Sequence, residues 1–515
     1  MADHKVLITT SGIGSRLGKL TDFTNKSLVR IGDKPAISHI IEYYPKNTSF
    51  VVTLGHFGSY IKEFLTLAYP NRDFTFINVD NFKGPGSSLG HSILQAKSEL
   101  QCPFIFHASD TILTDLDTIP NLEYNWCAGA YKEETSQYRT LRTNNGWVDT
   151  IAEKGEINFD YPYIGLCGIK DYKLFWHELS NLISNSESQN LSDVHVINKM
   201  TKNVPFSVFQ TKLWLDTGST EELRRTRSHF NSSINVLDKD DESIYMFKDF
   251  VVKFFANKEI NLNRVKRAKI LGNVCPDVTH HTDNFYKYKK VKGDIASNLV
   301  GESRFLDLLE WADNNLWEER QTNNFVNKCK KFYIDKSIKR IDEYLEKNKF
   351  ENEYINNEKI PLAKDLIYQS ENIITNNLLP SKIHGDFILD NIIDTGEDFT
   401  LIDWRQDFSG DLYCGDLYYD LAKINHNLTV NHDIVSKGLF NYSPKNCYIL
   451  CNSTLMKFKH LLHDFIKRKN FSLKKVKVLS SVIWINMAPL HEYPFNKFLF
   501  NFGKYNLHKE LSNES

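Results

Sequence analysis

Acidic and amide side chains cluster between His384 and Asp403, in the segments His-Gly-Asp-Phe-Ile-Leu-Asp-Asn and Leu-Ile-Asp. Asp386 lies five positions before Asn391, so a tight loop can direct a carboxylate at a substrate hydroxyl while the amide turns back to a metal ion. Asp403 ends a short apolar segment and is the second expected metal ligand. This pattern predicts a phosphoryl-transfer centre; the alternative is an acidic surface loop in which Asp, Asn and Gly only form turns.

A second chemical pattern lies near the N-terminus, where the apolar segment 6–10 leads into a glycine turn. The predicted nucleotide-binding residues of this turn are Ser11, Gly12 and Gly14. Glycine lets backbone N–H groups approach phosphates closely, because no side chain holds the anion away. Arg16 and Lys26 follow. Two cations and a metal ion suffice to neutralise a triphosphate while a phosphate oxygen attacks the α-phosphorus in line, although either cation could instead be a solvated surface charge.

The segment from Ser11 to Pro35 resembles the sugar-phosphate nucleotidyltransferase signature. It contains Gly-x-Gly-x-Arg-Leu, a lysine that in the family usually follows a proline, and a Gly-Lys-Pro turn. Asn25 replaces that proline here, and Asp33 is inserted into the turn. The resemblance implies that Arg16 stabilises the departing pyrophosphate and Lys26 the α-phosphoryl group.

The same resemblance implies further site residues. Asp110 and Asp216, each at the end of an apolar segment, would bind Mg²⁺. A second nucleotide-binding loop, whose pattern does not specify the base, would contain Gly86, Ser87 and Ser88. The acceptor pocket would contain Glu153, Lys154 and Gly165, unless Lys154 is only a charge at a strand end.

The segment 384–403, together with Gly-Asp and Asp-Leu-Ala in 415–422, resembles the aminoglycoside phosphotransferase and choline kinase superfamily, which has the protein-kinase fold. The resemblance implies that Asp386 is the catalytic base and that Asn391 and Asp403 hold magnesium ions. The acids of the segment 415–422 would brace the catalytic loop.

Lys253 lies in the second strand of a predicted hairpin and matches the superfamily's ATP-phosphate lysine. An outward-facing strand lysine is the alternative. The predicted helix 261–271 contains no glutamate to pair with it, which leaves Glu259, just before that helix, as a substitute. Arg405 would meet a carboxylate or phosphate of the acceptor. An aromatic box for a quaternary amine would instead use Trp404, Tyr413, Trp484 and Tyr493.

These residues require two domains, as the length of 515 residues also indicates. Alternating strands and helices predict an α/β fold with a Rossmann-like nucleotidyltransferase domain, residues 1–232, whose parallel sheet is covered on both faces. Residues 243–515 are expected to form a bilobal α+β kinase-like domain.

Composition restricts the partners. The net charge is −1, with 63 basic and 64 acidic side chains, so no global field favours nucleic acid or an anionic membrane. No apolar run reaches transmembrane length and no signal peptide is recognisable. Eight cysteines without a Cys-x-x-Cys pair suit reduced thiols. These features predict a cytoplasmic location.

Together the patterns favour a bifunctional enzyme with Mg²⁺ at both sites. ATP would phosphorylate a small alcohol, aminoalcohol or sugar, and an NTP, with CTP or UTP favoured, would then be coupled to that phosphate. The product would be an activated donor for surface glycan or lipid assembly. The alternative is one active domain joined to a nucleotide-binding sensor or scaffold.

Overall fold

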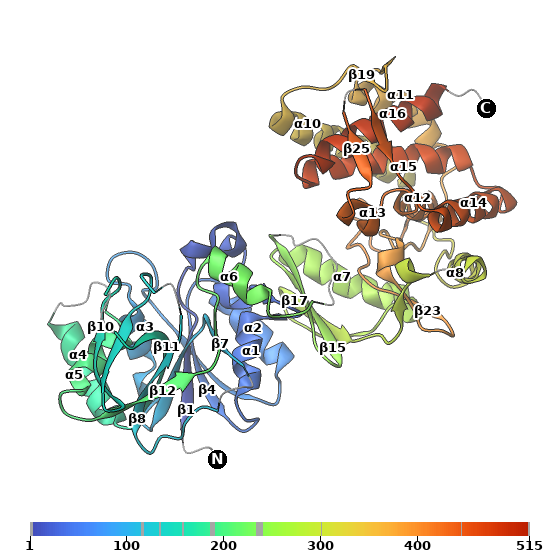
Figure 1. The fold of residues 1–515 in the computed structure, drawn as a ribbon. Coiled ribbons are helices and arrows are strands. Elements are labelled where there is room, and N and C mark those ends of the chain that lie inside the picture. The colour runs from blue at the N-terminus through green and yellow to red at the C-terminus, as the bar shows by residue number, and fades with distance from the viewer. Residues whose placement is uncertain are drawn as a thin grey trace. The chain divides into compact units, whose positions relative to one another are not determined.

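The computed structural model describes residues 4–114, 118–132, 135–156, 159–185, 191–232, 240–299, 301–443 and 445–512. The chain divides into two compact units, Met1–Lys258 with His280–Lys290, and Glu259–Thr279 with Val291–Ser515 (Figure 1). The predicted linker falls largely on residues 233–239, which lie outside the described residues. The domain limits 1–232 and 243–515 therefore stay a prediction.

The first unit contains a mixed β-sheet with the strand order β5-β4-β1-β6-β11-β8-β12-β10-β9. In that order the strands are Asp73–Asn78, Ser49–Leu54, Lys5–Thr9, Phe104–Ala108, Tyr161–Ile169, Asn125–Ala130, Phe206–Thr211, Trp147–Ala152 and Thr140–Asn144. β1 is parallel to β4 and β6, whereas β11 is antiparallel to β6 and β8. The expected parallel sheet is therefore wrong for β11, β10 and β9, which pair with antiparallel neighbours, whereas β12 is parallel to β8. Between β6 and β11 the described residues form no helix, and parallel neighbours need a long crossover, usually a helix.

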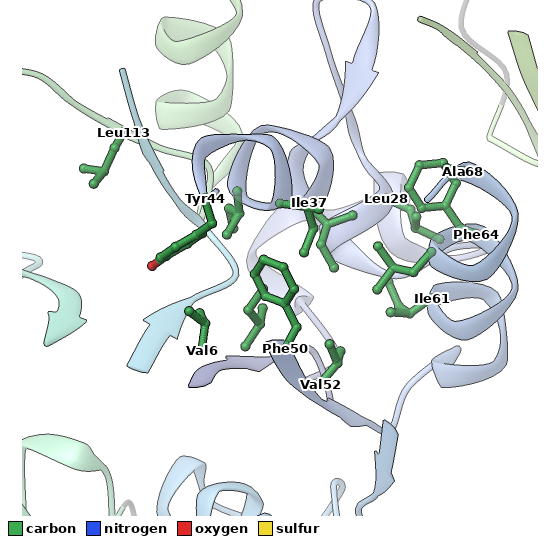
Figure 2. Close-up of a cluster of buried hydrophobic side chains, with 14 of the residues drawn as sticks. Val6, Leu28, Ile37, Tyr44, Phe50, Val52, Ile61, Phe64, Ala68 and Leu113 are labelled. Carbon is green, nitrogen blue, oxygen red and sulfur yellow. The ribbon is translucent and has the colours of Figure 1, made fainter. Parts of the chain in front are cut away.

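Helices cover both faces of this sheet, as the sequence predicts (Figure 1). Their bounds are α1 Ala36–Tyr43, α2 Gly58–Ala68, α3 Leu89–Gln95, α4 Tyr172–Ser184 and α5 Asp193–Met200. Successive strand residues point to opposite faces, so Val6 and Ile8 join the core with α1 and α2, while Leu7 joins the core with α3, α4 and α5. Figure 2 shows Phe50 beside Ile37 of α1 in the cluster that also contains Val6. Burial of each such side chain contributes about 1.5–3 kcal/mol.

Two short strands complete the carboxyl edge of the first unit. β7 (Thr111–Leu113) and β13 (Trp214–Asp216) are antiparallel neighbours. Helix α6 (Thr220–Arg227) then begins after Ser219, whose side chain accepts a hydrogen bond from the backbone of Glu222. A small hairpin joins β2 (Arg30–Ile31) to β3 (Lys34–Pro35).

The hairpin predicted as the start of a kinase-like domain forms, and it packs within the first unit. A sheet with the order β14-β15-β17-β16 contains Glu242–Met246, Phe250–Phe255, Phe285–Lys289 and Val278–His281. Tyr245 and Phe285 share a buried core with Phe64 of α2. The Tyr245 hydroxyl donates to the Leu28 carbonyl at 2.7 Å. This small sheet is thus joined to the N-terminal unit by apolar burial.

Helices make up most of the second unit. They are α7 Lys258–Leu271, α8 Glu302–Asn315, α9 Phe325–Lys330, α10 Lys336–Asn348, α11 Ala363–Thr375, α12 Leu417–Asn427, α13 His432–Ser436, α14 Ser453–Arg468, α15 Leu473–Met487 and α16 Phe495–Ser512. A π-helical turn, Lys331–Asp335, joins α9 to α10. α15 packs against α12 and α16. Glu259 lies inside the first turn of α7, not before the helix as expected.

The strands of the second unit are short. They are β18 Asp294–Ile295, β19 Tyr354–Ile355, β20 Glu358–Lys359, β21 Pro380–Ser381, β22 Ile392–Asp394, β23 Phe399–Leu401, β24 Gly415–Asp416, β25 Phe440–Tyr442 and β26 Cys447–Ile449. In the sheet β18-β22-β23, Ile392 at the start of β22 pairs with Leu401 at the end of β23, so the predicted catalytic loop and Asp403 lie at the same end of this sheet. A kinase-like fold for this part of the chain stays a prediction. Within the described ranges, no helix is both long and apolar enough to cross a membrane.

Candidate active sites

A cavity of about 250 Å³ opens in the first unit at the carboxyl end of β1. Its lining residues are Thr9, Ser11, Gly12, Lys26, Phe82, Ser87, Ser88, Leu89 and Ser92. Segments distant in the sequence meet here, because the hydroxyl oxygen of Ser11, after β1, lies 2.8 Å from that of Ser92 in α3. Ser88 caps α3 by accepting a hydrogen bond from the backbone of His91 at 3.0 Å. Four predicted nucleotide-binding residues, Ser11, Gly12, Ser87 and Ser88, therefore line one cavity with the predicted catalytic Lys26.

Two predicted glycines shape the cavity loops without lining the cavity. Gly14 has a φ of 74°, and a Cβ there would lie 2.9 Å from the Lys26 Cβ. Gly86 has a φ of 83° in a turn where the backbone and hydroxyl of Ser87 donate to the Gly84 carbonyl at 3.1 and 2.6 Å. Both positions suit glycine, which adopts positive φ at no steric cost.

Asn25, which stands in place of the family's proline, anchors the segment that carries Lys26. Its side chain is fully buried. Its Nδ2 donates to the carbonyls of Thr10 and His56 at 2.8 and 2.6 Å, and its Oδ1 accepts from the backbone of Ser27 at 2.9 Å. The asparagine therefore supplies by hydrogen bonds the local rigidity that proline would supply through its ring.

Asp110 and Asp216 come together because β7 and β13 pair. The backbone N–H of Thr217 donates to the Asp110 carbonyl at 3.0 Å. A Cβ at Gly218 would lie 3.1 Å from Asp216 Oδ1, 3.2 Å from Arg16 Nη2 and 3.3 Å from Asp110 Oδ2. Three predicted site residues therefore surround one small space, which only glycine at this position leaves open.

The two carboxylates of this cluster have pKa values that are shifted in opposite directions. Lys26 Nζ lies 2.9 Å from Asp110 Oδ2. Burial raises the pKa of Asp110, but the charges of Lys26 and Arg16 outweigh burial and hold that pKa below its ordinary value. Burial and the neighbouring charge of Asp110 raise the pKa of Asp216. A divalent cation between the two carboxylates would favour the ionised form of both.

The donor set fits Mg²⁺. Carboxylate oxygens are the ligands that this ion prefers, and it is commonly held by one or two carboxylates plus substrate phosphates. In the described part of the chain, no third acidic, histidine or cysteine side chain joins Asp110 and Asp216 as a potential ligand. Phosphate oxygens and water would complete the coordination.

Tyr138 and Lys132 also belong to this cluster, although the sequence did not predict them as site residues. The Tyr138 hydroxyl donates to Asp216 Oδ2 at 2.7 Å, and Lys132 Nζ donates to Tyr138 Oη at 2.8 Å and to Glu222 at 2.6 Å. They orient the Asp216 carboxylate. Both lie in an irregular connection after β8, where no spacing or motif marks them.

The predicted acceptor residues lie apart from the cavity lining. Gly165 interrupts the register of β11, with a φ of 72°, and a Cβ there would lie 2.8 Å from the Ala108 Cβ at the end of β6. Glu153 and Lys154 follow β10 and are exposed. Glu153 pairs with Arg139 at 3.1 Å. Their roles in acceptor binding stay predictions.

The predicted catalytic loop of the second unit brings Asp386 and Asn391 together. Asn391 Nδ2 donates to the Asp386 carbonyl at 3.0 Å and to its Oδ2 at 3.3 Å. The backbone N–H of Ile402 donates to the Asn391 carbonyl at 2.8 Å, which ties the strand before Asp403 to the loop. Asp403 has a φ of 60° and lies 3.5 Å from Arg264 Nη1.

Asp420 of α12 holds the start of this loop. It is fully buried and accepts hydrogen bonds from the backbone N–H groups of His384 and Gly385, both at 2.8 Å, and from Trp317 Nε1 at 3.2 Å. Burial raises the pKa of Asp420 to about 6, against the opposing effect of these donors. The loop geometry therefore depends on a carboxylate outside it.

Lys423 pairs with the expected catalytic base. Its Nζ lies 2.7 Å from Asp386 Oδ1. Burial raises the pKa of Asp386, but Lys423, then His384 and Arg405, outweigh burial and hold that pKa well below its usual range. Lys423 directly follows the Asp-Leu-Ala motif, but no spacing within the catalytic loop points to it.

For the other residues predicted to serve the kinase reaction, the structure gives the burial of Lys253 and of four aromatic side chains. Lys253 lies on β15 in the first unit and is buried, which contradicts a solvent-facing strand lysine; ATP binding by it stays a prediction. The proposed aromatic box does not form. Trp404 and Trp484 are buried, whereas Tyr413 and Tyr493 are 63% and 71% exposed. The tryptophans contribute to the core and the tyrosines face solvent.

Comparisons with known proteins give similarities for the N-terminal region. No protein-family model matches the chain. The probable glucose-1-phosphate cytidylyltransferase of Bacillus subtilis (strain 168) is 27% identical over 178 residues, covering 29% of this chain and 68% of that protein.

Two solved structures are also similar to the chain. The CTP:phosphocholine cytidylyltransferase from Streptococcus pneumoniae has a TM-score of 0.39 and 19% identity, covering 44% of this chain and 99% of that one. A putative glucose-1-phosphate thymidylyltransferase from Bacillus anthracis has a TM-score of 0.38 and 18% identity, covering 46% and 98%. The N-terminal region is thus similar in sequence to a nucleotidyltransferase.

Proposed function

We propose that this chain is a bifunctional enzyme that phosphorylates a small hydroxyl compound and then activates the product with a nucleotide. The C-terminal part would use ATP. The N-terminal part would couple the new phosphate to the nucleoside monophosphate of an NTP, with CTP or UTP favoured, and release pyrophosphate. Such activated compounds serve as donors for surface glycan or lipid assembly.

The observation that carries the proposal is the cluster of Arg16, Lys26, Asp110 and Asp216 in the first unit. Lys26 both lines the cavity and contacts Asp110, so one cation links the nucleotide cavity to the carboxylates. The 27% identical relative from Bacillus subtilis, a probable cytidylyltransferase, supports this half and favours CTP.

In the proposed transfer, an acceptor phosphate oxygen forms a bond to the α-phosphorus while the α–β phosphoanhydride bond breaks. Lys26 would neutralise the α-phosphoryl oxygens and Arg16 the leaving pyrophosphate. Mg²⁺, held by Asp110 and Asp216, would supply further neutralisation of phosphate charge. Fixed charges are effective in such a site because they need no reorganisation when the reaction occurs.

In the proposed kinase step, the acceptor's hydroxyl oxygen attacks the γ-phosphorus of ATP and ADP leaves. Asp386 would receive the hydroxyl proton, and Asn391 and Asp403 would hold Mg²⁺. The low pKa of Asp386 makes it a weak base, so we infer that it orients the hydroxyl and accepts the proton late. A loose phosphoryl-transfer transition state requires little more than such positioning.

The test separates the two halves. Wild type is incubated with Mg²⁺, ATP, CTP or UTP and a panel of polyols, aminoalcohols, hydroxy acids and sugars, and products are identified by mass spectrometry. Asp386→Asn should abolish ADP formation but leave nucleotidyl transfer to presynthesised phosphates. Lys26→Ala should let the phosphorylated intermediate accumulate.

The outcomes also distinguish the sensor or scaffold alternative. If one activity is absent from wild type while the corresponding nucleotide still binds, that half is a binding module. If Asp386→Asn abolishes both activities with the fold intact, the two sites are not independent.

A further inference from the structure

Positive side chains gather beside Asp386 in the second unit. Lys336 begins α10, directly after the π-helical turn, and Arg405 follows Asp403 by two positions. The two cations share one aromatic ring, because Lys336 Nζ lies 4.5 Å and Arg405 Cζ 5.0 Å from the centroid of Phe332. A cation placed over an aromatic ring is stabilised without a carboxylate partner.

Arg405 is held against the catalytic loop. A Cβ at Gly385, the residue before Asp386, would lie 2.7 Å from the Arg405 Cβ, and the Arg405 backbone N–H donates to the His384 carbonyl at 3.1 Å. Its Nε donates to the Asp407 carbonyl at 3.1 Å. This hydrogen bond fixes the direction of the guanidinium, and neither Nη group forms a hydrogen bond with another described residue.

The cluster has more positive than negative charge. Among the described residues, no carboxylate forms an ion pair with Lys336 or Arg405 within 4.0 Å. Asp386, the acidic group that acts on Lys336, is already paired with Lys423. Arg340 of α10 also acts on Lys336 but pairs with Glu343 at 2.7 Å.

More cations than carboxylates act on the ammonium group of Lys336. Burial and, after it, the charges of Arg405, Arg340 and Lys423 together lower the pKa of Lys336 to about 6, against the opposing charge of Asp386. An ammonium group that is partly removed from water beside other cations is costly unless an anion offsets it. A bound anion would provide that compensation.

We propose that the acceptor of the kinase step carries an anionic group, a carboxylate or a phosphate, which Lys336 and Arg405 bind while the acceptor's hydroxyl faces Asp386. This inference rests on the proposed kinase function and specifies its substrate class. A guanidinium binds carboxylate and phosphate through two parallel hydrogen bonds, so the Nη groups of Arg405 suit either ligand. The failure of the aromatic box to form argues against a quaternary amine.

The test compares acceptors matched in size. ADP formation from ATP and Mg²⁺ is measured with glycerate, glycerol phosphate, glycerol and choline, and then with larger hydroxy acids, sugar phosphates and neutral sugars. We expect anionic acceptors to have kcat/KM values at least about 10-fold above those of their neutral counterparts, since a hydrogen bond to a charged group is worth roughly that much or more. The glycerate and glycerol phosphate series separate the carboxylate from the phosphate as the recognised group.

Variants locate the effect. Lys336→Met and Arg405→Met should each raise KM for the best anionic acceptor about 10–100-fold while changing kcat by less than about 3-fold. Lys336→Arg should restore part of the affinity, because it keeps the charge. Lys339→Met removes an exposed lysine from the same helix and should leave both constants unchanged. Circular dichroism and melting curves establish that each variant is folded.

The results that overturn the inference differ from those that overturn the kinase. If neutral or cationic acceptors are preferred, or if the two methionine variants leave KM for the anionic acceptors unchanged, the anion site is wrong and the kinase stands. If no acceptor of any class produces ADP, the proposed kinase function is wrong and the inference falls with it.

Discussion

Lys26→Met is the sharpest test of the N-terminal site. Lys26 Nζ lies 2.9 Å from Asp110 Oδ2, and the two side chains are 20% and 21% exposed. Methionine keeps most of the volume and removes the charge. The variant therefore deletes the cation that links the cavity to the carboxylates, with little change in packing.

The expected loss in turnover follows from the number of charges removed. One preorganised donor aimed at developing charge is worth about 10²–10³-fold in kcat, or about 2.7–4 kcal/mol. We expect nucleotidyl transfer to fall by that factor. The proposed ATP-dependent phosphorylation should stay unchanged, because Lys26 and Asp386 belong to different units.

The same substitution has a predicted pH signature. The pKa of Asp110 is depressed in the folded wild type, so its ionised form adds stability above its unfolded pKa, and that stability is lost as pH falls through the folded value. Without Lys26, burial is opposed mainly by Arg16, so the pKa of Asp110 rises. The difference in free energy of unfolding between wild type and variant should therefore widen as pH rises from about 4 to 7.

The assay is pyrophosphate release with CTP or UTP and a phosphorylated acceptor, combined with urea unfolding at several pH values. Lys19→Met is the matched control, because Lys19 is exposed in the same segment and should behave as wild type. A rate for Lys26→Met within about 3-fold of wild type, with the fold intact, would refute the assignment of Lys26.

Three further predictions follow from single contacts. Gly218→Ala places a Cβ 3.1–3.3 Å from two carboxylates and a guanidinium, so nucleotidyl transfer should fall at least about 10-fold while ADP formation persists. Asn25→Ala removes two buried N–H donors and the oxygen that caps the segment of Lys26. The free energy of unfolding, measured with urea, should fall by about 1–3 kcal/mol. An unchanged free energy of unfolding would show that Asn25 does not hold Lys26 in place. Burial raises the pKa of Asp420 from 3.8 to about 6. Between these two pH values the folded protein holds a proton on Asp420 that the unfolded chain has lost. The contribution of Asp420 to the free energy of unfolding therefore falls by up to about 3 kcal/mol as pH rises from about 4 to 6. The stability difference between wild type and Asp420→Asn should narrow over that range, and a pH-independent difference would contradict the raised pKa.

Local patterns were sufficient to predict several features. The strand followed by a glycine turn predicted β1 and part of the cavity lining, because a strand, a tight turn and the following helix involve only neighbouring residues. The spacing of Asp386 and Asn391 predicted their contact for the same reason: five positions in one loop leave few arrangements. The hairpin β14–β15 was likewise predictable from two apolar runs and a short turn.

Other features depended on contacts between distant segments. Lys423 reaches Asp386 from another helix, and Tyr138 reaches Asp216 from a connection without a recognisable pattern. The antiparallel pairing of β11 with β6 and β8 and the packing of Tyr245 on α2 depend on which apolar surfaces bury one another. No local spacing encodes that choice, because the burial of apolar surface is non-directional and proportional to area. Residue types and short spacings thus indicated the chemistry of each site, whereas the partners that tune its charges came from the packing of the whole fold.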